Sequence, residues 1–180
     1  MADNQTDLVI LGGGSGGYAA ALRSAELGKS IVLIERDKVG GTCLHRGCIP
    51  TKALLHAGEV ADAARESAQF GVNATFEGID MSGVHKYKDG VIGKNYKGLT
   101  SLIKSRGIQI VEGEGRLVGP RSVQVDSPDG SSNNYTGTSV VLATASYYST
   151  RPGLALGGRR VIRGQHTLRI APITASALVH

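Results

Sequence analysis

The feature that most constrains the fold is a glycine-rich turn between two apolar segments near the start of the chain. Residues 7–11 form a short apolar run, which is typical of a parallel strand buried on both faces. Six residues at 12–17, Gly-Gly-Gly-Ser-Gly-Gly, follow directly and satisfy the pattern G-x-G-x-x-G. A helix is predicted from about residue 15 to 27, and residues 30–35 predict a second strand. This order of elements predicts a parallel α/β domain.

The same turn has the residues that a dinucleotide site requires. Gly12, Gly14 and Gly17 occupy the three glycine positions, and Glu35 ends the second strand. Glycines allow the backbone to approach a pyrophosphate, and a helix N-terminus stabilises its negative charge. A carboxylate at this position can accept hydrogen bonds from both hydroxyls of an adenosine ribose, and it would repel a 2′-phosphate. The alternative is a glycine-rich turn that binds nothing, which the strand–turn–helix–strand context disfavours.

The second informative stretch, residues 40–52, contains both cysteines of the sequence. Cys43 and Cys48 are separated by four residues, and Pro50 follows. Proline suits the first turn of a helix, because the amide hydrogen that it lacks would be unpaired there anyway. Cys48 is therefore expected where a loop enters a helix, and the positive end of the helix dipole favours the thiolate there. Because the thiolate is the nucleophile in disulfide exchange, the spacing favours a redox-active pair.

Three other interpretations of the cysteine pair remain open. A structural disulfide suits a small secreted domain, but residues 1–7 are polar and predict no signal peptide. A zinc site needs about four ligands and there is no second cysteine pair, so no metal is predicted. Two core cysteines could also stand this close by coincidence. No apolar run approaches the ~20 residues that span a bilayer, and we expect a cytoplasmic protein without membrane contact.

The net charge of +5 comes entirely from the end of the chain. Residues 151–180 contain five arginines and no acidic residue, whereas the first 150 residues balance 15 basic against 15 acidic side chains. A basic tail can bind polyanions. It contains no interleaved aromatics or recognisable binding motif, so no nucleic-acid partner is expected. We predict a domain over residues 1–150 and a basic tail over residues 151–180.

The rest of the chain predicts two helices and then a group of strands. The expected helices cover residues 53–70 and 81–105, with the lysines of the second on a solvated face. The expected strands are 109–112, 115–118, 122–126 and 135–143, with a hairpin turn at 127–130 and a buried segment at 139–143. The predicted fold is a three-layer α/β domain, with a parallel sheet, helices and a small antiparallel excursion around residues 109–138.

The glycine turn and the segment Cys-x4-Cys-Ile-Pro-Thr-Lys at residues 43–52 together resemble the flavin-dependent pyridine nucleotide–disulfide oxidoreductases. The resemblance covers residues 7–146. It is greatest to the dihydrolipoyl dehydrogenases, although glutathione and mercuric reductases share the architecture. It implies a Rossmann-like FAD-binding domain and the conversion of dihydrolipoamide and NAD⁺ to lipoamide and NADH. The implied partner is dihydrolipoamide or a lipoyl-bearing protein.

The resemblance also implies a role for each residue of the site. Cys43 matches the interchange thiol that reacts with the dithiol substrate, Cys48 matches the thiol next to the flavin, and Lys52 matches the lysine at the flavin N5 edge. Glu35 is implied to bind the adenosine ribose, and the backbone of Gly115 to pass near the adenine. The residues implied to bind FAD are Gly12, Gly14, Gly17, Glu35, Arg36, Gly41, Thr42, Cys43, Lys52, Gly115 and Thr144.

The sequence also departs from the family pattern. It is well under half the length of a family member and has no match to the NAD-binding domain, to the later segment that binds the flavin ribityl chain, or to the interface domain that supplies a His–Glu pair and the dimer contact. The family usually has glycine where Ala145 stands. We therefore expect at most the dithiol–flavin half of the reaction. The alternative is a non-catalytic fragment that binds flavin or nucleotide.

Overall fold

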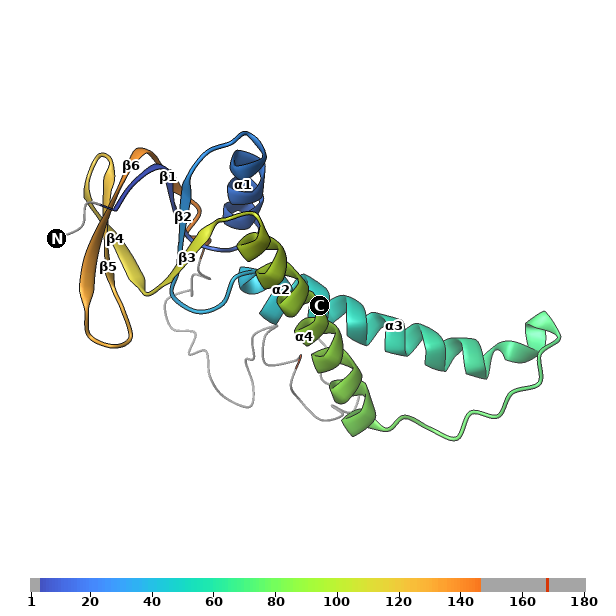
Figure 1. Cartoon of the computed structure of the whole chain (residues 1–180). Helices are drawn as coiled ribbons and strands as arrows, with labels where there is room; N and C mark the ends of the chain where they lie inside the picture. Colours follow the sequence, from blue (N-terminus) through green and yellow to red (C-terminus); the bar gives the residue numbers. More distant parts are fainter. Residues whose placement is uncertain (1–3, 147–167, 169–180) are drawn as a thin grey trace. The chain divides into compact units, whose positions relative to one another are not determined.

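The computed structural model describes residues 4–146 and Leu168 (Figure 1). Except for Leu168, the predicted tail at 151–180 lies outside the described residues. The elements in chain order are β1 (Asn4–Leu11), α1 (Ser15–Glu26), β2 (Ile31–Glu35), α2 (Gly41–Arg46), α3 (Cys48–Arg65), the 3₁₀ helix η1 (Ser67–Phe70), α4 (Met81–Ser105), β3 (Gln109–Glu112), β4 (Glu114–Gly119), β5 (Ser122–Asp126) and β6 (Ser132–Leu142). The described chain divides into two compact units: residues 4–43 with 95–146, and residues 44–94 with Leu168.

The first unit contains one six-stranded sheet in the order β3-β2-β1-β6-β5-β4. β1 pairs in parallel with β2 on one side and with β6 on the other, and β2 pairs in parallel with β3. β4, β5 and β6 pair antiparallel. The predicted α/β fold, with a parallel sheet and an antiparallel excursion, is confirmed.

The sheet curls because one residue connects its two edge strands. β3 and β4 lie at opposite ends of the strand order, yet only Gly113 separates them along the chain. Gly113 has φ +158°, and its N–H donates a hydrogen bond of 3.1 Å to the carbonyl oxygen of Glu35. At Gly115 an added Cβ would overlap Leu11 Cδ1 and lie 3.1 Å from Ile34 Cγ2. The start of β4 therefore crosses directly over the carboxyl ends of β1 and β2.

Two apolar clusters lie on the two faces of the parallel strands. One fills the space between these strands and the antiparallel strands; its buried residues are Val9, Val32, Ile34, Val111, Val123, Val125 and Tyr135. The other packs against α1 and the last turns of α4, and its buried residues are Ile10, Ala21, Ile31, Leu33, Val39, Ile103 and Ile108. Successive residues of β2 point to opposite faces, which explains why its apolar run is unbroken. The three-layer arrangement follows from these two clusters.

β6 is less buried than its apolar sequence predicts. The segment 139–143 was expected to be a buried strand, but Val140 and Val141 are half-buried and Leu142 is 59% exposed. The buried positions of β6 lie earlier, at Tyr135 and Gly137. An unbroken apolar run is typical of a strand covered on both faces, but the actual covering depends on which elements pack against the strand, and the run itself does not specify these.

The helices of the second unit differ from the prediction at their ends. The helix expected at 53–70 begins at Cys48, so Pro50 lies in its first turn as expected, and it ends at Arg65 before a 3₁₀ turn. Lys88 of α4 was expected on a solvated face but is 6% exposed. Its Nζ lies 3.2 Å from Asp89 Oδ1 and donates a hydrogen bond of 3.1 Å to the carbonyl oxygen of Leu168. Among the described residues, no helix is both long and apolar enough to cross a membrane.

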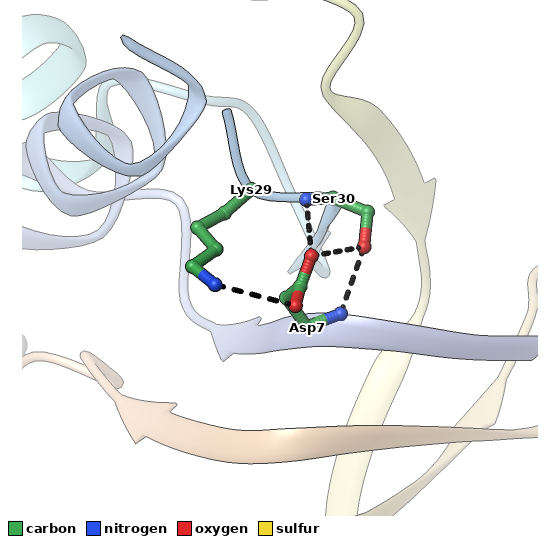
Figure 2. Close-up of polar contacts among 3 residues, drawn as sticks. All are labelled: Asp7, Lys29 and Ser30. Carbon is green, nitrogen blue, oxygen red and sulfur yellow. Dashed lines mark hydrogen bonds and ion pairs between the residues drawn. The ribbon is translucent and has the colours of Figure 1, made fainter. Parts of the chain in front are cut away.

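The amino end of the parallel strands is tied together by polar contacts at Asp7 (Figure 2). Asp7 Oδ2 accepts hydrogen bonds of 2.8 Å from the backbone N–H and the hydroxyl of Ser30, and Ser30 Oγ accepts one of 2.8 Å from the Asp7 N–H. Lys29 Nζ lies 3.6 Å from Asp7 Oδ1. The Ser30 hydrogen bonds, with a smaller contribution from Lys29, lower the pKa of the Asp7 carboxyl. These contacts support the register of β1 and β2 at the end opposite the glycine turn.

Candidate dinucleotide and thiol site

The glycine turn lies where β1 leaves the sheet, and two of its glycines are required by packing. Gly12 has φ +106°, and an added Cβ would overlap the carbonyl oxygen of Ala143. An added Cβ at Gly17 would overlap the carbonyl oxygen of Gly12 and lie 2.9 Å from its carbonyl carbon. These two glycines allow β1, α1 and the end of β6 to approach one another at backbone distance.

Gly14 differs from these two, because an added Cβ there would meet no atom of the chain within 4 Å. It is the N-cap residue of α1, and no side chain caps the helix N-terminus there. The first turn of a helix has N–H groups without intrahelical partners, and the helix dipole favours an anion beside them. The uncapped helix N-terminus beside Gly14 is therefore open to an anion such as a phosphate group.

The Glu35 carboxylate is held against this turn by two backbone N–H groups. Oε2 accepts a hydrogen bond of 2.7 Å from Gly13, and Oε1 accepts one of 2.9 Å from Asp37. An added Cβ at Gly13 would lie 3.1 Å from Glu35 Oε2. Each carboxylate oxygen has two lone pairs, so both oxygens retain capacity to accept a ribose hydroxyl. The structure thus brings together the turn and the acidic residue that the sequence places 18 residues after Gly17.

Residues 40–43 lie against the same turn. The Gly40 N–H donates a hydrogen bond of 2.8 Å to the carbonyl oxygen of Gly13. Gly41 has φ +58°, and an added Cβ would lie 2.8 Å from Gly14 Cα. α2 begins here, where no helix was predicted, and carries the exposed Thr42 and the half-buried Cys43. Gly13 and Gly40 were not among the residues predicted to bind FAD, although they belong to the glycine runs at residues 12–14 and 40–41.

The end of β6 forms the other side of the turn. The Ala143 N–H donates a hydrogen bond of 2.8 Å to the carbonyl oxygen of Leu11, and the exposed Thr144 follows. Ala145 has φ +66° and is the one non-glycine residue with positive φ in the described part of the chain. Left-handed backbone favours glycine, so the conformation at this position explains the glycine that the resemblance implies.

The two thiols lie at the junction between α2 and α3. Cys43 is the third residue of α2, and Cys48 is the first residue of α3, after the N-cap residue Gly47. The Cys48 thiol is free and exposed in this structure, and Cys43 is half-buried. One turn later Thr51 Oγ1 donates a hydrogen bond of 2.7 Å to the carbonyl oxygen of Gly47, and Lys52 is exposed. Cys43 belongs to the first unit, and Cys48 and Lys52 belong to the second.

The described residues contain no cluster of three or more histidine, cysteine or acidic side chains that could hold a metal ion. The glycine turn lies beside the acidic residue that ends β2, and a thiol pair at the start of a helix follows along the chain. The family model described as pyridine nucleotide-disulphide oxidoreductase matches residues 6–173. The chain belongs to this family.

The proteins similar in sequence to this chain include dihydrolipoyl dehydrogenases and a leghemoglobin reductase. The chain is 38% identical to a dihydrolipoyl dehydrogenase of Bacillus subtilis over 96% of its own length and 38% of that protein. It is 34% identical to a leghemoglobin reductase of Vigna unguiculata over 98% of its length and 34% of that protein. The chain thus spans little more than a third of the relatives that it matches.

The same fold is present in solved structures of other proteins. LpdA of Mycobacterium tuberculosis superposes with a TM-score of 0.81 at 24% identity, covering 92% of this chain and 37% of that one. The Cu(II) complex of the flavoprotein disulfide reductase RclA of Escherichia coli superposes with a TM-score of 0.74 at 22% identity over 93% of this chain and 35% of that one. The two superpositions confirm the predicted fold, and the family model with the relatives above confirms the predicted family. The roles predicted for individual site residues stay predictions.

Proposed function

We propose that the first unit binds FAD at the carboxyl ends of β1 and β2. The observation that carries the proposal is the uncapped N-terminus of α1 beside Gly14, with the Glu35 carboxylate held against the same turn at 2.7 Å from the Gly13 N–H. The turn and the Gly41–Thr42 backbone would hold the pyrophosphate, and Glu35 the adenosine ribose. We expect Arg36, Gly115 and Thr144 to complete the adenosine and pyrophosphate contacts.

We further propose that the thiol pair exchanges electrons with a dithiol substrate such as dihydrolipoamide. In the oxidised enzyme Cys43 and Cys48 would share a disulfide; a thiolate of dihydrolipoamide attacks Cys43 Sγ, and Cys48 leaves as a thiolate. The second substrate thiol then displaces Cys43, which releases lipoamide and leaves both cysteines reduced. The start of α3 favours the Cys48 thiolate. Bound FAD supplies the acceptor for this electron pair, and Lys52 is expected to stabilise negative charge beside it.

The substrate is proposed from the names of the relatives, which include several dihydrolipoyl dehydrogenases. Transfer of the electrons to NAD⁺ is the remaining half of that reaction. A related disulfide reductase, or a flavin-binding module without turnover, is the alternative. Reduction of the protein by a dithiol distinguishes a disulfide reductase from a flavin-binding module without turnover.

The experiment incubates the full chain with excess FAD, removes unbound FAD by gel filtration, and records the visible absorption spectrum before and after one equivalent of dihydrolipoamide. We expect protein-bound flavin bands near ~450 nm and a new long-wavelength charge-transfer band on reduction. Cys48→Ser should retain the flavin bands and lose the long-wavelength band, whereas His56→Ala, which alters an exposed residue of the same helix, should retain both. A protein that stays colourless with excess FAD would refute FAD binding. Flavin bands that one equivalent of dithiol leaves unchanged would support the non-catalytic module.

A further inference from the structure

We propose that Glu114 is a positioning residue that holds the Arg36 guanidinium as a platform for the adenine base of the bound dinucleotide. The inference deepens the proposed FAD site and rests on it. Arg36 Nη1 lies 3.3 Å from Glu114 Oε1 and 3.5 Å from Oε2, so both carboxylate oxygens face the same nitrogen. The sequence gives no sign of this pair, because the two residues are 78 positions apart.

The ion pair lies at the ligand-binding end of the sheet. Arg36 directly follows Glu35, whose carboxylate contacts the glycine turn. Glu114 begins β4, and the chain reaches this position because the Gly113 N–H is bonded to the carbonyl oxygen of Glu35 at 3.1 Å. The pair therefore bridges the carboxyl end of β2 and the start of β4, beside the position expected for the adenosine ribose. In open α/β sheets ligands bind outside the carboxyl ends of the parallel strands.

The exposure of the pair argues against a mainly structural role. The side chains of Arg36 and Glu114 are 51% and 66% exposed. Ion pairs this exposed contribute little to folding, because solvent screens the charges and both side chains lose rotamer freedom. Half of the Arg36 surface remains accessible to a ligand, and a planar guanidinium stacks well on an aromatic ring or a nucleobase.

A carboxylate beside the guanidinium restricts its orientation before the ligand arrives. Ordering a long, flexible side chain opposes binding, and a side chain already held in place loses less freedom when the base stacks on it. Glu114 thus acts through Arg36 and need not touch the dinucleotide. This predicts that removing Glu114 weakens binding in proportion to how well the base stacks, and leaves the pyrophosphate and ribose contacts unchanged.

The experiment compares ADP and UDP binding to the full chain by titration calorimetry. Both ligands carry the ribose and the pyrophosphate, but the purine offers a larger stacking surface than the pyrimidine. We expect the unchanged protein to prefer ADP by roughly tenfold. Glu114→Gln should weaken ADP binding by about three- to tenfold and move the ratio of the UDP and ADP Kd values towards one, with UDP binding nearly unchanged.

Two further variants make the test specific. Glu112→Gln removes the same charge from an exposed side chain two positions earlier and should leave the ratio unchanged. Arg36→Lys retains a positive charge that can pair with Glu114 but lacks the planar face, and it should lose the purine preference. The inference is overturned if Glu114→Gln retains the ratio or weakens both ligands equally. If the unchanged protein binds neither ADP nor FAD, the proposed FAD site fails and the inference fails with it.

Discussion

Replacing Gly14 and Gly17 separately by alanine should distinguish a glycine needed for ligand approach from one needed for packing. A methyl group at Gly14 meets no atom of the chain within 4 Å, and the φ of −68° there is allowed for any residue. Alanine at an N-cap is less favourable than glycine by about 0.5–1 kcal/mol, but it reduces the freedom of the unfolded chain by about 0.4–1 kcal/mol. Gly14→Ala should therefore change the free energy of unfolding by less than about 0.5 kcal/mol.

At Gly17 the same methyl group overlaps the carbonyl oxygen of Gly12, which is backbone held between β1 and α1. The helix must move away from the sheet, and overpacking of this kind costs about 1–3 kcal/mol, occasionally more. We expect Gly17→Ala to lower the free energy of unfolding by about 3 kcal/mol, which corresponds to a fall in Tm of roughly 6–12 °C for a domain of this size.

Thermal unfolding without ligand and FAD titration of each variant provide the assay. Gly14→Ala should unfold at the Tm of the unchanged protein but bind FAD at least about tenfold more weakly, because its methyl group occupies the space assigned to the pyrophosphate. Gly28→Ala is the control: an added Cβ there also meets nothing within 4 Å, but its φ of +73° should reduce stability without changing FAD affinity. If Gly14→Ala binds FAD normally, the proposed position of the pyrophosphate is wrong.

Two further predictions concern residues around the site and the sheet. Ala145→Gly should raise the free energy of unfolding by about 0.5–1 kcal/mol. Glycine relieves left-handed backbone strain of about 1–2 kcal/mol, and this gain exceeds the cost of the greater freedom that glycine gives the unfolded chain. A lower stability in denaturant titration would contradict this. The lowered pKa of Asp7 stabilises the fold above the ordinary carboxyl pKa of 3.8, and this contribution is lost as the pH falls through the lower folded-state pKa. Asp7→Asn should therefore be less stable than the unchanged protein at pH 7, and the difference should narrow by pH 3; a difference that is constant with pH would refute the linkage.

The local elements could be predicted from the sequence because their signals are local. The run at 30–35 predicts β2, and the glycine turn with its following alanines predicts α1, within one residue at each end. The joining of opposite sheet edges at Gly113 could not be predicted, because it depends on which distant strands pair. The pairing of Arg36 with Glu114 was missed for the same reason. The contact of the buried Lys88 with Leu168 was missed because the two residues lie 80 positions apart.

α2 was missed for a different reason. It is six residues long and begins at Gly41, which has positive φ. Short helices that begin with glycine give no periodic signal, and this one is supported by packing of Leu44, which is 7% exposed. At the thiol pair the sequence therefore missed the short helix that carries Cys43, and the chemistry expected of the pair stays a prediction.

The parallel pairing of β1 with β6 has a consequence for the order of events during synthesis. β1 is the first strand of the chain, but the partner that completes its second side ends at Leu142. A ribosome that adds about 5–20 residues per second needs on the order of ten seconds to proceed from one strand to the other. During that interval the edge of β1 has no partner, and Gly12 lacks the Ala143 backbone against which it packs. A nascent chain would thus complete the surroundings of its glycine turn in one late step, when β6 leaves the ribosome.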